Sequence, residues 1–142
     1  MANIHASCVS WQDKGILILG QSGSGKSDLS LRLIQEYDAL LVADDRVDLN
    51  VSHETIVASS PQPLVGMLEV RGIGILKPPH VDRTSLDIVV ELVSDPKKVD
   101  RLPHEEYWGF DGIKLPLIRI CAFENSATHK IIASLSWKKA IK

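Results

Sequence analysis

The sequence predicts an α/β domain built on a mixed β-sheet with flanking helices. Two observations carry this prediction: a short apolar run leads through a glycine-rich turn into a helix-spaced segment, and the middle of the chain is mostly strand-like. A length of 142 residues suits one folded unit, so we expect residues 1–142 to form a single domain. The net charge of −2 argues against a nucleic-acid partner held through its backbone phosphates.

The first third of the chain reads as strand, helix, strand. Residues 16–19 are wholly apolar and lie between glycines, which favours a buried strand. Apolar side chains then recur at helical spacing over residues 26–37, at Leu29, Leu33 and Ile34. A second apolar run at residues 40–43 predicts another buried strand, and a right-handed crossover between the two strands predicts a parallel pair.

The remaining elements are shorter or less regular. Residues 55–58 and 67–70 predict short strands, and residues 86–92 alternate with the period of two that is typical of a longer strand. Residues 115–120 predict a strand that lies at an edge or starts at Pro116. Residues 127–141 show a weak helical pattern that ends in lysines.

Composition also bounds the setting of the protein. The apolar runs are strand-sized, which argues against a membrane partner, and the first residues lack the pattern of a secretory signal, so we expect a cytoplasmic protein. Cys8 and Cys121 are too few for a disulfide framework or a structural zinc site, and reduced thiols are expected.

A phosphate-binding loop follows the first predicted strand. The stretch fits the pattern G-x-x-x-x-G-K-[ST] without a mismatch, and it consists of Gly20, Gln21, Ser22, Gly23, Ser24, Gly25, Lys26 and Ser27. In this motif backbone N–H groups surround phosphate oxygens, the lysine neutralises the β and γ phosphates, and the serine holds Mg²⁺. The sequence therefore predicts an ATP or GTP site; a glycine-rich turn that caps a helix is the alternative.

Two carboxylates follow the second predicted strand directly. Asp44 and Asp45 come where ligands of α/β sheets sit, at the carboxyl end of a strand. Adjacent strand residues point to opposite faces, so we expect at most one of them to face the nucleotide squarely. The other can reach Mg²⁺ or a backbone N–H, and a polar turn without function is the alternative.

Three segments together resemble the catalytic C-terminal domain of the HPr kinase/phosphorylase family. They are the loop at residues 20–27, the run VADDRV at residues 42–47 and the segment GMLEVRGIGI at residues 66–75. The resemblance implies a P-loop-containing domain that uses ATP and Mg²⁺ to phosphorylate a serine of HPr or an HPr-like phosphocarrier. The reverse activity of the family removes this group with inorganic phosphate and yields pyrophosphate.

The resemblance also implies roles for individual residues. Asp44 corresponds to the residue that takes the seryl proton, and Lys26, His5 and Arg101 correspond to further active-site positions. Ser27 and Glu69 correspond to the Mg²⁺ ligands. Each of these residues also has an ordinary interpretation without function: Glu69 as a solvated strand residue, His5 as a solvated histidine, and Arg101 as part of an exposed polar loop. His5 is followed by Ala6, where the family usually has glycine.

The sequence departs from the family pattern in two places. The chain begins almost at the catalytic domain, so we expect it to resemble the short forms from α-proteobacteria, without the family's usual N-terminal domain. The resemblance implies a homo-oligomer, which is a hexamer in the family. Residues 120–126 replace a Pro- and Gly-containing segment that is associated with dephosphorylation, and Glu124 stands where an arginine is expected. An acidic residue repels phosphate, so we expect weak or absent phosphorylase activity.

Two other functions compete with a protein kinase. One is a nucleotide sensor without catalysis, against which the intact Lys26, Ser27, Asp44 and Glu69 argue. The other is a small-molecule P-loop kinase, which typically carries a cluster of arginines over the phosphates, whereas the arginines here are scattered.

Overall fold

A computed structural model describes residues 2–140 and confirms the mixed α/β architecture. Its main sheet has the strand order β1-β5-β6-β9-β3-β2-β4, and β11 pairs with both β9 and β10. A separate hairpin consists of β7 and β8. The strands are β1 (Ala2–His5), β2 (Ser7–Trp11), β3 (Lys14–Leu19), β4 (Leu40–Ala43), β5 (Arg46–Ser52), β6 (Thr55–Ser59), β7 (Leu68–Val70), β8 (Gly74–Leu76), β9 (Arg83–Val93), β10 (Glu106–Phe110) and β11 (Ile113–Cys121).

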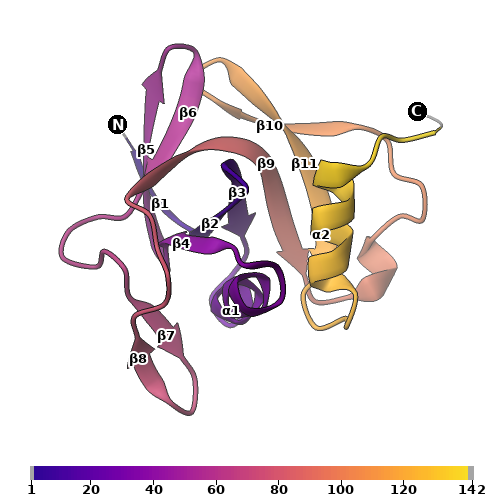
Figure 1. Cartoon of the computed structure of the whole chain (residues 1–142). Coiled ribbons are helices and arrows are strands. Elements are labelled where there is room, and N and C mark those ends of the chain that lie inside the picture. The colour runs from indigo at the N-terminus through magenta and orange to yellow at the C-terminus, as the bar shows by residue number, and fades with distance from the viewer. Residues whose placement is uncertain (1, 141–142) are drawn as a thin grey trace.

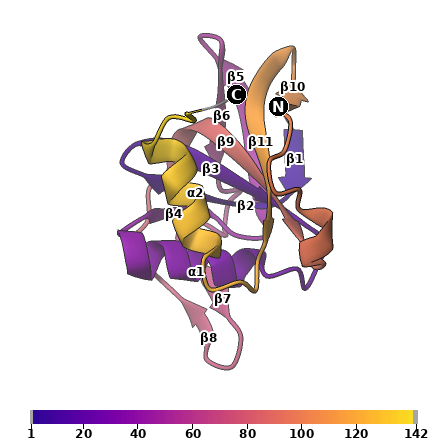
Figure 2. The ribbon, with the colours of Figure 1, turned by 90° about the vertical axis from the view of Figure 1, so that its right-hand side faces the viewer.

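Two α-helices and one short 3₁₀ helix complete the part of the chain that the structure describes. They are α1 (Lys26–Tyr37), α2 (Ala127–Ser136) and η1 (Pro96–Lys98). Figures 1 and 2 show the curled sheet with α1 and α2 packed on it, while the β7–β8 hairpin extends away from the body. Of the helices within residues 2–140, none has the length and apolar character that crossing a membrane requires.

The prediction that the two strands flanking α1 form a parallel pair is wrong, because they are not neighbours in the sheet. Strands β3 and β4 run in the same direction, but β2 lies between them and is antiparallel to both. In β2 the polar residues Ser7 and Ser10 stand beside apolar ones, yet all five residues of the strand are buried. Insertion of this strand moves the end of β4, and with it Asp44, one strand further from the phosphate loop than in a simple βαβ unit.

Strand β9 contains a bulge that a simple period of two does not show. Gly15 pairs with Leu86, but the next residue, Ile16, pairs with Ile88, so Asp87 is the extra residue. The Gly15 N–H donates to Asp87 Oδ2 at 3.0 Å. As a result Leu86 packs in one hydrophobic cluster, whereas Ile88 packs in the other.

Strand β11 is not the predicted edge strand, because it pairs with β10 on one side and with β9 on the other. The strand also starts at Ile113 rather than at Pro116, although its parallel register with β9 begins at Leu117, directly after the proline. The last predicted helix is shorter than expected: α2 ends at Ser136, Trp137 is extended, and Ile141 lies outside the described residues.

The core consists of two hydrophobic clusters on the two faces of the sheet. One cluster joins α1 and α2 to the sheet, and its fully buried members include Leu29, Leu33 and Ile131. The other lies under β5, β6 and β10 and includes Leu17 and Val89. Leu29 and Leu33 are one helical turn apart and therefore lie on the same face of α1. This face packs against the sheet.

Candidate functional site

The candidate site lies at one edge of the sheet, where several strands end. Strands β3, β9 and β11 are parallel, and β4 has the same direction as β3. The phosphate loop, the segment that starts at residue 94, the segment at residues 122–126 and the pair of aspartates therefore all leave the sheet at one edge. In α/β proteins the carboxyl ends of the strands are where ligands bind.

The predicted phosphate loop joins β3 to α1. Gly25 precedes the first residue of the helix with a φ of 99°, a conformation that favours glycine. A Cβ added to Gly20 would lie 2.4 Å from Ser24 Oγ and 3.1 Å from Ser24 Cβ, so a larger residue at this position would have to displace Ser24. The loop is thus folded as the sequence pattern predicts, tightly turned into the start of a helix.

Lys26 is anchored inside this loop. Its Nζ donates to Gly20 O at 2.8 Å and to Gln21 O at 3.1 Å, and the residue is only 6% exposed. Burial lowers the pKa of Lys26 from its ordinary value, and the carboxylates of Asp45 and Asp44 oppose this effect. A buried ammonium group beside a glycine-lined turn is suited to bind an anion.

Two features of the loop fit a phosphate group. Ser24 Oγ is buried and has no hydrogen-bond partner among residues 2–140, which leaves a polar atom that an anion can satisfy. The first turn of α1 has no side-chain cap, so its N–H groups are available to phosphate oxygens. The residues present therefore fit the phosphates of a nucleotide.

Asp44 lies beside the loop and is hydrogen-bonded on both carboxylate oxygens. Ser27 Oγ donates to Asp44 Oδ1 at 2.7 Å, and Ser7 Oγ donates to the same oxygen at 3.1 Å. The backbone N–H of Glu69 donates to Asp44 Oδ2 at 3.3 Å. The structure thus brings together Ser27 and Asp44, two of the predicted site residues, and adds Ser7, which the sequence reading missed.

Asp45 points to a different partner. Its Oδ1 lies 2.7 Å from His5 Nε2, and its side chain is 69% exposed. A φ of 68° at Asp45 turns the chain sharply between β4 and β5, which separates the two carboxylates. His5 is at the end of β1, opposite Arg46, so the pairing of β1 with β5 brings this histidine to the aspartates.

Glu69 is on β7, at the base of the hairpin that extends from the body. Its side chain is exposed, and its backbone N–H makes the hydrogen bond to Asp44. Within residues 2–140 no group of three or more His, Cys, Asp or Glu side chains could hold a metal ion alone. The hydroxyl of Ser27 and the carboxylate of Glu69, the two predicted metal ligands, are oxygen donors of the kind that Mg²⁺ takes, since Mg²⁺ commonly binds one or two carboxylates together with substrate phosphates.

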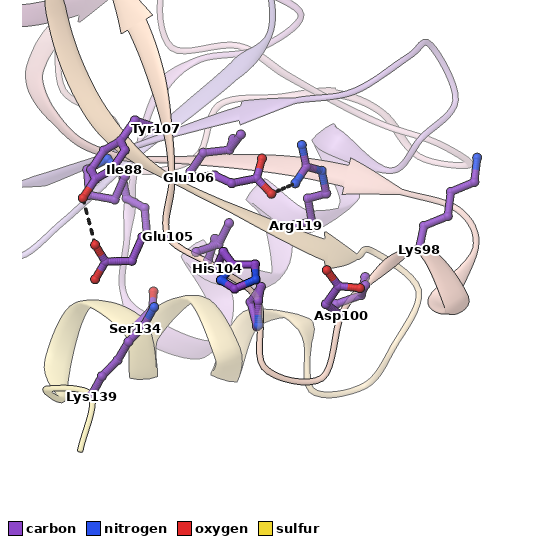
Figure 3. Close-up of a pocket in the computed structure, with 15 residues that line it drawn as sticks. Ile88, Lys98, Asp100, His104, Glu105, Glu106, Tyr107, Arg119, Ser134 and Lys139 are labelled. Carbon is purple, nitrogen blue, oxygen red and sulfur yellow. Dashed lines mark hydrogen bonds and ion pairs between the residues drawn. The ribbon is translucent and has the colours of Figure 1, made fainter. Parts of the chain in front are cut away.

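Arg101 is not brought into contact with these residues. It is exposed in the loop between η1 and β10, which leaves the same sheet edge. Its neighbour Asp100 lines a separate cavity of about 280 Å³ between α2, β10 and β11. Figure 3 shows this cavity with the Glu105–Tyr107 and Glu106–Arg119 contacts at its wall; Lys26 and Asp44 are not among its lining residues.

The segment at residues 122–126 is braced by Arg32 of α1. The guanidinium donates to Ala122 O at 2.8 Å, to Glu124 O at 3.0 Å and to Asn125 O at 3.5 Å. Glu124, expected to repel phosphate, has its Oε2 at 2.6 Å from Lys130 Nζ. Nothing in the sequence singles out Arg32, because its acceptors are backbone atoms that are 90 or more residues away.

Comparison with known proteins extends these observations. A family model described as HPr Serine kinase C-terminal domain matches residues 1–142. The HPr kinase/phosphorylase of Clostridium botulinum (strain Eklund 17B / Type B) is 41% identical over 109 residues, which cover 77% of this chain and 34% of that protein. The HPr kinase/phosphorylase of Malacoplasma penetrans is 32% identical over 140 residues, which cover 91% of this chain and 46% of that protein.

A solved structure is similar over nearly its whole length. The HPr(Ser) kinase/phosphatase from Coxiella burnetii superposes with a TM-score of 0.83 at 27% identity, covering 95% of this chain and 94% of that one. The matched regions of the two bacterial enzymes above are less than half of their lengths, so the chain spans only part of those curated relatives.

Proposed function

Because this chain belongs to the HPr serine kinase C-terminal domain family, we propose that it transfers the γ-phosphoryl group of ATP to a serine of HPr or an HPr-like phosphocarrier. The seryl oxygen forms the new bond to phosphorus, the bond to the β-phosphate oxygen breaks, and the seryl proton leaves to a base. We propose that residues 1–142 act as one domain in this reaction.

The observation that carries the proposal is the 2.7 Å hydrogen bond from Ser27 to Asp44, which joins the phosphate loop to the carboxylate pair. We propose that Lys26 and the loop residues 20–27 bind the phosphates, and that Ser27 and Glu69 hold Mg²⁺. Bound Mg²⁺ would offset the phosphate charge. Arg101 stays a proposed catalytic residue, supported by the place at which its loop leaves the sheet.

Two neighbouring aspartates are candidates for the proton acceptor. The family resemblance implies Asp44, and this assignment stays a prediction. The hydrogen bonds favour the other carboxylate: Asp44 accepts from Ser7, Ser27 and the Glu69 N–H, which engages both of its oxygens. Asp45 is exposed and touches His5. We therefore propose that Asp45 accepts the seryl proton with His5 beside it, and that Asp44 orients Ser27.

Single amide substitutions separate these roles. Asp45→Asn should lower kcat by about 10²- to 10⁴-fold, the usual contribution of a general base, without changing the affinity for Mg-ATP. Asp44→Asn should raise the Mg²⁺ concentration that gives half-maximal activity. Asp48→Asn is the matched control, because the Asp48 carboxylate accepts a hydrogen bond from Asn3, away from the phosphate loop. It should leave both quantities unchanged.

Phosphoryl transfer to purified HPr-like proteins, followed by mass spectrometry of the modified serine, provides the rate. Loss of kcat in Asp44→Asn with full activity in Asp45→Asn would identify Asp44 as the proton acceptor. ATP binding by the wild-type protein without transfer to any such protein would favour the nucleotide sensor instead. Consumption of ATP with a small metabolite would favour the small-molecule kinase.

Phosphorylase activity and assembly are separate proposals. We propose that removal of phosphate from the phosphorylated partner is weak, because the Glu124 carboxylate lies in the segment next to the phosphate loop. Robust pyrophosphate formation from the phosphorylated partner and inorganic phosphate would contradict this. A homo-oligomer, a hexamer by family resemblance, is proposed as well, and light scattering of the purified protein measures it.

A further inference from the structure

An exposed aromatic ring lies directly against the phosphate loop. A Cβ added to Gly25 would be 3.2 Å from Ala122 Cβ and 3.4 Å from Phe123 Cε1, so this segment touches the loop at the residue before α1. Figures 1 and 2 both place the turn between β11 and α2 beside α1. Phe123 is nevertheless 66% exposed. A phenylalanine with one side on the loop and the other in water offers a face to a ligand.

The backbone on both sides of this ring is held by α1. Arg32 donates to the carbonyl oxygens of Ala122, Glu124 and Asn125, on both sides of Phe123 in the sequence. The Glu124 N–H also donates to Cys121 O at 3.2 Å. The backbone that carries the ring is therefore held before a ligand arrives, which reduces the entropy lost on binding.

The order of the strands indicates which end of a bound nucleotide lies near the Phe123 ring. Along the sheet, the strands run β11, β9, β3, β2, β4. The phosphate loop follows β3 in the middle, the Asp44–Asp45 pair follows β4 on one side, and Phe123 follows β11 on the other. The γ-phosphate must face the aspartates if they serve the transfer. The rest of the nucleotide then extends toward β11.

We propose that Phe123 stacks on the nucleobase of the bound nucleotide. This inference rests on the proposed nucleotide binding and names a residue that determines affinity for the base rather than for the phosphates. Stacking on an aromatic side chain suits every base, because each base has a flat π face. Purines have the larger face, so a preference for ATP over CTP is expected from the same contact.

The test compares two ligands that share phosphates but not a base. Calorimetric titration of the full chain with Mg²⁺ and either ATP or inorganic tripolyphosphate gives the two dissociation constants. Phe123→Ala should weaken ATP about 5- to 140-fold, the range known for loss of one base stack, and leave tripolyphosphate unchanged. Phe123→Trp should retain ATP affinity. Trp137→Ala is the matched control, because Trp137 is also exposed (77%) but follows α2.

Each outcome decides the matter. An equal loss for ATP and tripolyphosphate in Phe123→Ala would show that the ring only shapes the loop, and unchanged ATP affinity would show that the base lies elsewhere; either overturns the proposal. Wild-type protein that binds neither ligand would overturn both this inference and nucleotide binding. Tight, Phe123-dependent ATP binding without phosphoryl transfer would support the stack while the proposed kinase function fails.

Discussion

Replacement of Arg32 by methionine removes the brace between α1 and the segment that enters α2. Methionine keeps most of the aliphatic stem and removes only the guanidinium, so packing changes little. Two well-formed bonds are lost, to Ala122 O at 2.8 Å and to Glu124 O at 3.0 Å; the third, at 3.5 Å, contributes little.

The expected magnitude follows from these bonds. Hydrogen bonds from a charged donor contribute roughly 1.5–3 kcal/mol each, and water can partly replace the donor because the Arg32 side chain is 23% exposed. We therefore expect a loss of about 2–3 kcal/mol in the free energy of unfolding. The 3.8 Å pair with Asp28 adds at most a few tenths of a kcal/mol, because Asp28 is 60% exposed.

Urea unfolding followed by tryptophan fluorescence measures this loss. Asp28→Asn isolates the ion pair, and Arg83→Met is a matched control, because Arg83 is exposed at the start of β9. If Arg32→Met and Arg83→Met agree within about 0.5 kcal/mol, which is the usual range for surface substitutions, the brace does not stabilise the fold and the reasoning fails.

Three further predictions concern buried groups. Leu33→Ala should cost about 2–5 kcal/mol in urea unfolding, because Leu33 is fully buried between α1 and the sheet. Burial raises the pKa of the Cys8 thiol, and Cys121 is also buried, so neither should react with a thiol reagent until urea unfolds the protein. Because the pKa of Lys26 is lower in the folded state than its ordinary value of 10.5, there is a pH range below 10.5 in which the unfolded chain keeps this proton and the folded chain has released it. Stability should therefore rise relative to Lys26→Met as pH rises toward 10.5, and a flat difference would contradict this.

The local elements at the phosphate loop could be predicted from the sequence because their signals are local. The helix expected over residues 26–37 matches α1, and the strand expected over residues 40–43 matches β4. Glycine spacing and a 3.6-residue period depend only on neighbours in the chain. The insertion of β2 between β3 and β4 depends on pairing across the sheet, which no short window contains.

The site itself was predictable in its residues but less so in its contacts. Lys26, Ser27 and Asp44 come together because the strand ends bring them to one edge. The division between Asp44 and Asp45 arises from a left-handed turn at Asp45 and from the distant strand β1, which supplies His5. Ser7 was missed for the same reason, since its role depends on where β2 lies.

The pairing of strand β9 determines how cooperatively the protein unfolds. Its first residues pair with β6 and its later residues with β3 and β11, and its side chains enter both hydrophobic clusters. Neither half of the core can melt while β9 stays in place, so thermal denaturation should be one all-or-none transition. A backbone cut at the Asp111–Gly112 turn would spare this strand and leave such cooperativity intact, whereas a cut within β9 would abolish it.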